Sequence, residues 1–324
     1  MAHTDNSRRL TARRRLRGEA PSTVAVLADE RDFAAMRRYD TFTFDDHAMY
    51  LRQVEGLLRA MAAKGTYTSV ALFDPDAYEQ YCTERRLDPD TPASRTRYTA
   101  DIAAQGVRVP YEGQPIARLL PDLVDQAGRQ TTWERASRLL ARAGGPAAHA
   151  TDSGQVAFAR ASRTLRRLIE AVGTGAHHLV CTVPAEGTTR LVAVLHAERH
   201  EDGHVHMGHP AATVFCTVLA AGFTAERPGG LALRSMVPGR PAVLRAWGIK
   251  HGTLVPMSEA EVFSAYCTDA LNGDPVPPEH GVEHRAGIEI DTELDMDLDA
   301  HFIKDLDRDL GVGLDKGPDT GEDD

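Results

Sequence analysis

Short apolar runs alternate with amphipathic segments through the first 143 residues. Residues 23–28 and 68–73 are continuous apolar runs, as in strands that are buried on both faces. Between them, residues 45–65 carry apolar side chains at helical spacing and end in glycine. The same patterns predict further helices near 29–39, 75–82, 93–105, 114–127 and 131–143, and further strands at 41–44 and 107–109. This alternation predicts a Rossmann-like α/β domain over residues 22–143, with a largely parallel sheet flanked by helices.

The pattern changes after residue 143. Residues 144–154 are rich in glycine and other breakers, and we expect a linker there. A helix over 155–172 and two strands at 178–183 and 190–200 are expected to follow. Helix followed by antiparallel strands predicts an α+β domain over residues 155–282.

The polar turn after residue 200 predicts the register of a hairpin. Glu201-Asp202-Gly203 fits a three-residue loop with glycine in the left-handed position. This loop pairs Ala197 with Met207 and places Val205 on the same apolar face. A two-residue loop would mix apolar with polar side chains, so the hydrophobic pattern selects the longer loop.

The C-terminal segment, residues 283–324, combines an acidic composition with strict alternation. Apolar residues from Ile288 to Leu298 alternate with acidic ones from Glu289 to Asp299, which predicts a strand over 287–299. A short helix ending at Gly311 and a disordered end are expected beyond it. The strand can dock on the protein's own sheet, the interpretation we favour, or add to the sheet of a partner.

Composition narrows the class of protein without naming a function. The chain has 324 residues, 42% hydrophobic and 26% charged, which indicates globular structure of about two domains. Residues 1–20 carry six Arg against two acids (+4), and residues 283–324 carry fifteen acids against four bases (−11). The total of −10 therefore leaves −10 − 4 + 11 = −3 for the middle. We expect residues 1–21 to be a basic, disordered leader, able to contact nucleic acid.

Other features of the composition bear on cellular context. Of the 37 basic residues only four are Lys, a bias typical of an actinobacterium-like genome. The four Cys are isolated within apolar stretches, which indicates a reducing compartment, and we expect the protein in the cytoplasm. No run approaches 18 apolar residues, so no membrane contact is expected.

Acidic residues follow both central strands of the expected N-terminal sheet. Asp29, Glu30 and Asp32 come after the first strand, and Asp74 and Asp76 come after the second. Parallel strands deliver their carboxyl ends to one edge of the sheet, so these side chains are expected to converge. Converging carboxylates suit Mg²⁺, with Asp29, Glu30, Asp74 and Asp76 as catalytic candidates, whereas capping of the following helices is the simpler explanation.

This arrangement resembles the Toprim domain of primases and topoisomerases. In that family a Glu follows the first strand and an Asp-x-Asp follows a later one, and Asp74-Pro75-Asp76 looks like the second motif. The first motif departs from the family, because Ala28 stands at the Glu position when Asp32 is matched to the downstream acid. The resemblance spans at most residues 22–125 and implies Mg²⁺-dependent phosphoryl transfer.

A histidine cluster lies on the expected hairpin. In the register given above, one face carries the side chains of His196, Glu198, His200, His204 and His206. Imidazole and carboxylate groups suit Zn²⁺ or a similar metal, so these five residues are the candidate metal ligands. The simpler interpretation is the solvent-facing polar side of a hairpin whose other face is core.

These observations support two hypotheses about function. The leading one is a cytoplasmic binding or regulatory protein with a protein partner, because no complete catalytic motif is present and the two ends carry opposite charge. The alternative is a Mg²⁺-dependent phosphoryl-transfer or nuclease-like enzyme that uses the carboxylates named above.

Overall fold

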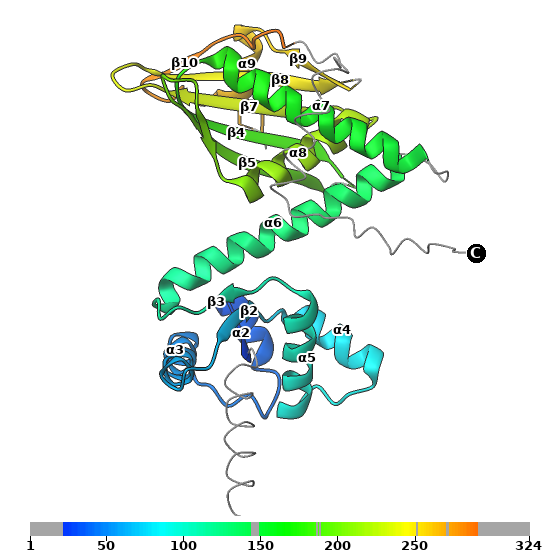
Figure 1. Cartoon of the computed structure of the whole chain (residues 1–324), viewed down its shortest axis with the longest axis vertical. Coiled ribbons are helices and arrows are strands. Elements are labelled where there is room, and N and C mark those ends of the chain that lie inside the picture. The colour runs from blue at the N-terminus through cyan, green and yellow to red at the C-terminus, as the bar shows by residue number, and fades with distance from the viewer. Residues whose placement is uncertain are drawn as a thin grey trace, which may run out of the picture. The chain divides into compact units, whose positions relative to one another are not determined.

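The chain folds into two compact units, residues 1–130 and 131–324 (Figure 1). The computed structural model describes residues 22–143, 149–185, 187, 189–250, 252–269 and 272–290, with the side chains of 149–153 left out. Helices and strands are mixed throughout, as the α/β prediction requires. The predicted basic leader and the segment beyond residue 290 lie outside the described residues.

The N-terminal unit is a three-stranded sheet with helices around it. Its elements are β1 (Ser22–Val26), α2 (Glu30–Met36), α3 (His47–Ala63), β2 (Thr68–Leu72), α4 (Pro75–Arg85), α5 (Pro92–Gln105), β3 (Val109–Pro110) and the first half of α6 (Ile116–Ala143). The strand order is β1-β2-β3, with β1 and β2 parallel and the short β3 antiparallel to β2. The longer of the two strand pairs is therefore the parallel one that the sequence predicted.

Two local expectations in this unit are wrong. Residues 41–44 form no strand; Phe42 and Phe44 instead pack against one another, with ring centroids 4.8 Å apart, and both contact Tyr50. Their burial in an aromatic cluster replaces strand pairing. The helices predicted over 114–127 and 131–143 are one continuous helix, α6, because an interior glycine such as Gly128 costs only about 1 kcal/mol and does not end a helix.

The two units divide between Gln130 and Thr131, within α6. The sequence placed the boundary later, in the breaker-rich segment 144–154. The helix that follows, α7, begins at His149, so the second half of that segment is helical. Gly154, its last residue, lies inside α7, where a single glycine is tolerated.

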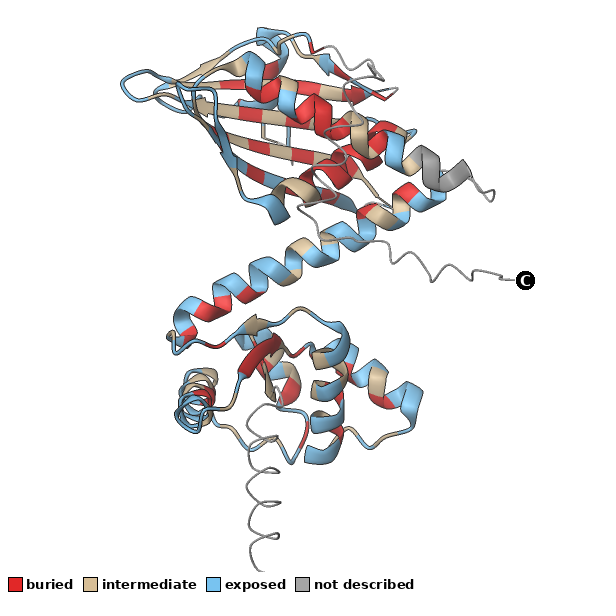
Figure 2. Cartoon of the chain, in the orientation of Figure 1, coloured by how far each residue is buried: buried red, intermediate tan, exposed pale blue. Residues whose placement is uncertain are grey.

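The C-terminal unit is a seven-stranded sheet with helices packed against both faces (Figures 1 and 2). Its elements are the second half of α6, α7 (His149–Val172), β4 (Gly175–Pro184), β5 (Arg190–Arg199), β6 (Val205–Met207), α8 (His209–Thr224), β7 (Gly229–Met236), β8 (Ala242–Lys250), β9 (Thr253–Pro256), α9 (Glu259–Tyr266) and β10 (Val282–His284). The strand order is β10-β8-β7-β4-β5-β6, and β9 also pairs with β8. All pairs are antiparallel except β10 with β8.

Strict alternation along β4 and β5 buries one face of this sheet. Every second residue, from Leu191 to Ala197 in β5 and from His177 to Val183 in β4, is buried. These side chains share a core with α7 and with α8, ten of whose residues are buried in a row. The predicted hairpin register is confirmed, since Ala197 pairs with Met207, Glu198 with His206, and Gly203 has a φ of +87°.

The C-terminal segment joins this core before the described chain ends. Trp247 Nε1–H donates to the Ile288 carbonyl at 2.8 Å, and Ile290 is buried among the core residues. Residues 287–290 form no strand, so the predicted strand is absent over the part of it that the structure describes. Docking on the protein's own fold, the favoured interpretation, holds for Ile288 and Ile290; residues 291–299 lie outside the described part.

The carboxyl end of β1 is held by two side chains of α3. The Leu27 N–H donates to the Tyr50 hydroxyl at 3.2 Å, and the Leu27 carbonyl lies 3.1 Å from His47 Nε2. Tyr50 is buried, and burial raises the pKa of its hydroxyl to about 12. The backbone at the end of β1 therefore depends on these two groups.

We predict that Tyr50→Phe destabilises the N-terminal unit by about 1–3 kcal/mol, because it leaves a buried N–H without an acceptor while keeping the ring. Urea unfolding followed by circular dichroism measures the change. Tyr67→Phe removes the hydroxyl of an exposed tyrosine and is the matched control, with little expected effect. Equal stability of the two variants would contradict the prediction.

Candidate functional site

The acidic residues after β1 and β2 lie at one edge of the N-terminal sheet. Val26 pairs with Leu72, so Asp29 and Asp74 follow neighbouring strand ends. Asp29 caps α2 by accepting from the Asp32 N–H at 2.8 Å. Asp74 caps α4 by accepting from the Asp76 and Ala77 N–H groups at 2.9 and 3.0 Å. Both strand-end carboxylates thus serve as helix caps.

The carboxylates of Asp29, Asp74 and Asp76 lie close enough to Asp32 to affect its ionisation. The pKa of Asp32 is raised by burial and then by the negative charges of Asp29 and Asp74, with Asp76 adding a smaller effect. Glu30 and Asp76 stand in the first turns of α2 and α4, where negative charge is favourable. Within the described residues no three His, Cys, Asp or Glu side chains form a group suited to a metal ion, so this edge offers no geometry that supports the Mg²⁺ hypothesis.

Variants of Asp74 separate capping from metal binding. We predict that Asp74→Ala lowers the stability of the N-terminal unit by about 1 kcal/mol through loss of the cap. Asp74→Asn keeps the capping oxygen and relieves repulsion from Asp32, so it should be as stable as the wild type or more so. Unfolding in urea with and without MgCl₂ measures both effects. Stabilisation by MgCl₂ that both variants abolish would contradict capping as the role of Asp74.

The side chains of the histidine cluster lie on the predicted face of the hairpin, but they do not come together as a metal site. His196 lies across from His178 on β4, with the two Nδ1 atoms 3.1 Å apart and the ring centroids 4.4 Å apart. Glu198 pairs with His206, while His200 and His204 flank the turn. All except His178 are exposed, and none belongs to a metal-binding group within the described residues. His178 is 18 residues from His196 in the chain and becomes its neighbour only through the pairing of β4 with β5.

His177, on the opposite face of β4, is a structural histidine. It is 1% exposed, and its ring nitrogens lie 3.0 Å from Ser235 Oγ and 3.0 Å from the Gly173 carbonyl. Burial lowers its pKa, an effect that the hydrogen bond to Gly173 partly offsets. The folded state therefore resists protonating this ring.

We predict that the stability of the C-terminal unit falls as the pH drops below about 6.5. Because the pKa of His177 is lowered on folding, the unfolded state binds the extra proton there, with a slope of at most about 1.4 kcal/mol per pH unit for one group. Urea unfolding between pH 5 and 8 measures this, and His177→Gln should reduce the slope. His280→Gln, which removes an exposed histidine, is the control. An unchanged slope in His177→Gln would contradict the assignment.

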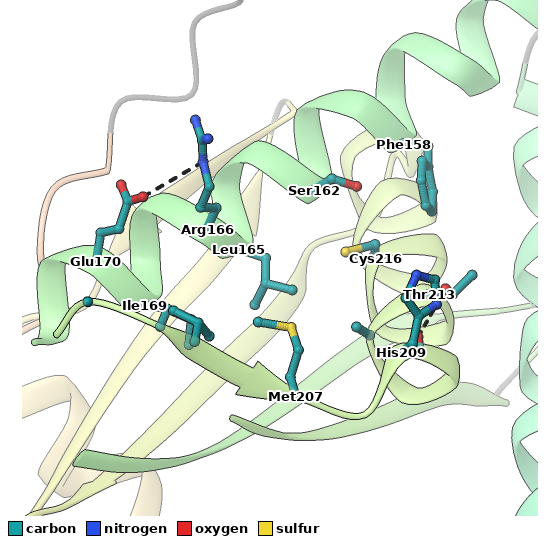
Figure 3. Close-up of a pocket in the computed structure, with 13 residues that line it drawn as sticks. Phe158, Ser162, Leu165, Arg166, Ile169, Glu170, Met207, His209, Thr213 and Cys216 are labelled. Atoms are coloured by element: carbon teal, nitrogen blue, oxygen red, sulfur yellow. Dashed lines mark hydrogen bonds and ion pairs between the residues drawn. The ribbon is translucent and has the colours of Figure 1, made fainter. Parts of the chain in front are cut away.

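A cavity of about 450 Å³ lies between α7, α8 and β6 in the C-terminal unit (Figure 3). Leu165 and Ile169 of α7 point toward Met207 of β6 across this space. The lining also includes Phe158, Ser162 and Arg166 from α7, Val205 from β6, and His209, Ala212, Thr213 and Cys216 from α8. Most of the wall is therefore apolar, with polar groups along α8 and at Ser162.

The polar groups of the cavity are already engaged or held neutral. Burial raises the pKa of the Cys216 thiol to about 12, against an opposing hydrogen bond from Ser162. Thr213 Oγ1 donates to the His209 carbonyl at 3.1 Å. Arg166 and Glu170 form an ion pair at 3.8 Å that points away from the cavity (Figure 3). The lining therefore offers hydrogen-bonding groups but no activated thiolate.

No pattern in the sequence predicts this cavity. Its walls come from residues 158–170, 203–207 and 209–216, and each stretch alone has the pattern of an ordinary core element. The cavity is created by the packing of these three segments and not by any local motif.

Comparison with known proteins bears on the N-terminal unit alone. Residues 11–114 match a family described as a domain of unknown function (DUF8829), which covers 104 of the 324 residues. No curated protein and no solved structure matches the chain. None of the helices that the structure describes is long and apolar enough to cross a membrane.

Proposed function

We propose that the protein is a binding or regulatory protein whose C-terminal unit takes a small, largely apolar molecule into the cavity between α7 and α8. The observation that supports this is the cavity itself: about 450 Å³, walled mainly by apolar side chains, with a few polar groups. Cavities of roughly 300–1,000 Å³ with this kind of lining are typical of small-molecule sites.

The chemistry of the lining indicates the kind of ligand. Leu165, Ile169 and Met207 offer a flexible apolar surface, and methionine adapts readily to ligand shape. Ser162 and Thr213 add hydroxyl groups, so a ligand with an apolar body and one or two hydrogen-bonding groups fits best. The protonated Cys216 thiol argues for binding over nucleophilic catalysis.

The Mg²⁺-dependent enzyme of the sequence analysis has less support. Asp29 and Asp74, two of its four candidate carboxylates, each use one oxygen, Oδ1, to cap a helix. We further propose a cytoplasmic location and a protein partner, since the opposite charges of the two ends suit association with a macromolecule. Nucleic acid contact through the Arg-rich leader is part of the same proposal.

Filling the cavity should abolish binding of an apolar probe. We predict that Ala212→Phe lowers the affinity for 1-anilinonaphthalene-8-sulfonate at least about tenfold, the loss expected when about 1.4 kcal/mol or more of contact is removed. Titration with the dye measures this. Val156→Phe adds the same ring at an exposed position of α7 outside the cavity and should bind like the wild type.

A second measurement keeps the test valid if Ala212→Phe folds poorly. Native mass spectrometry of the purified wild type and of the conservative Thr213→Val variant compares retention of any co-purified small molecule. Equal dye binding by Ala212→Phe and the wild type, with both variants folded by circular dichroism, would contradict the proposal.

A further inference from the structure

A second concave feature of the C-terminal unit is basic. Arg135, Arg138 and Arg142 of α6 line a cavity of about 280 Å³ together with Leu139, Ala185 and Thr189, which we call the arginine groove. The three arginines recur at helical spacing, so their guanidinium groups share one side of the helix. Within residues 131–143 the only acid is Glu134. Leu139 and Ala185 pack against the core and give the groove an apolar base.

The last described residues, 282–290, run toward the end of the sheet at which the arginine groove lies. β10 runs parallel to β8, with His284 opposite Leu244, and the Arg285 N–H donates to the Leu244 carbonyl at 2.9 Å. Gly287 is so close to β8 that an added Cβ would lie 2.7 Å from the Ala246 carbonyl oxygen. The Ile288 carbonyl then meets Trp247. The segment therefore advances along β8 toward its carboxyl end.

The pairing of β8 with β7, and of β7 with β4, identifies the strand that lies beside the carboxyl end of β8. Ile249 of β8 pairs with Gly229 of β7, and the next residue, Gly230, pairs with Thr182 of β4. The carboxyl end of β8 thus lies beside the carboxyl end of β4, which leads into Ala185 of the arginine groove. Two strand spacings, about 10 Å, separate β8 from β4.

The residues that follow have a pattern complementary to the groove. Five acids between Asp291 and Asp299 alternate with Thr292, Leu294, Met296 and Leu298. In an extended chain these two sets lie on opposite sides, so one side can meet arginines while the other covers apolar surface. Nine extended residues reach about 30 Å, well beyond the 10 Å between the strand ends.

We propose that the arginine groove is the docking site of the chain's own acidic segment, residues 291–299. Carboxylates of the segment pair with Arg135, Arg138 and Arg142, and Leu294 or Met296 covers Leu139 and Ala185. Arginine suits this role because its planar guanidinium binds carboxylate through two hydrogen bonds. The proposal does not depend on the ligand of the cavity between α7 and α8, because that cavity has different walls.

A distance measurement tests the proposal in the full-length chain. Nitroxide labels are placed on Ala143→Cys, one residue beyond Arg142, and on Ala300→Cys, one residue beyond the acidic segment. The four native cysteines are buried, which favours labelling of the introduced ones. Double electron–electron resonance should give one short, narrow distance. This population should shrink at high salt, because the screening length falls from about 10 Å at 0.1 M to about 3 Å at 1 M.

Three variants identify the occupant and the groove. Arg135→Gln/Arg138→Gln/Arg142→Gln should broaden and lengthen the distance distribution. Arg52→Gln/Arg59→Gln/Arg97→Gln removes the same charge from exposed positions of the N-terminal unit and should leave it unchanged. Deletion of residues 1–20, the competing basic segment, should also leave it unchanged.

Each alternative result overturns the proposal. A broad distribution in the wild type means that the segment does not dock. A narrow distance that survives the triple Arg135/Arg138/Arg142 substitution means that it docks elsewhere. Loss of the short distance on deletion of residues 1–20 means that the acidic segment pairs with the leader. Dye binding in the α7–α8 cavity, measured on the same variants, reports separately on the proposed function.

Discussion

Burial of one face of the seven-stranded sheet under α7 and α8 is the constraint on which the C-terminal unit depends. The alternation along β4 and β5 fixes the buried face, because a shift by one residue would expose Leu179 and Val183 of β4 and the leucines of β5. Near its carboxyl end α8 lies close to the sheet, where Gly222 leaves room for Val183 and Ile249. An added Cβ at Gly222 would lie 2.9 Å from Val183 Cγ2.

The same packing explains why a cavity forms at the other end of α8. There the helix begins directly after β6, a strand of only three residues, without a side-chain cap on its first turn. The short β6 gives the helices less sheet to rest on than the ten residues of β5 beside it. The space that remains between α7, α8 and β6 is the cavity, so the candidate site is a consequence of how the sheet ends.

The sequence predicted the features that depend on residues close together in the chain, and it failed where residues distant in the chain decide the structure. The hairpin register followed from Gly203 and the apolar pattern around it, all within a dozen residues, and it is confirmed. Residues 41–44 were assigned to a strand because their pattern is locally β-like, but contact with Tyr50 decided their conformation. Two pairs of residues meet only through tertiary packing: His178 with His196, and Ser162 with Cys216. No local sequence pattern predicts either contact.

The edges of the large sheet bear on whether partners bind by strand addition or through side-chain surfaces. At one edge the three residues of β6 pair only with Ala197–Arg199 of β5, so the rest of β5 has no strand partner on that side among the described residues. At the other edge β8 pairs with β10 and then with β9, and residues 285–288 bond to Leu244, Met257 and Trp247 where those two strands meet. The covered edge at β8 disfavours addition of a partner strand, whereas the unpaired part of β5 leaves the other edge open to one. Besides the open edge of β5, the unit has concave side-chain surfaces that differ in character: one is apolar between α7 and α8, and one is basic along α6.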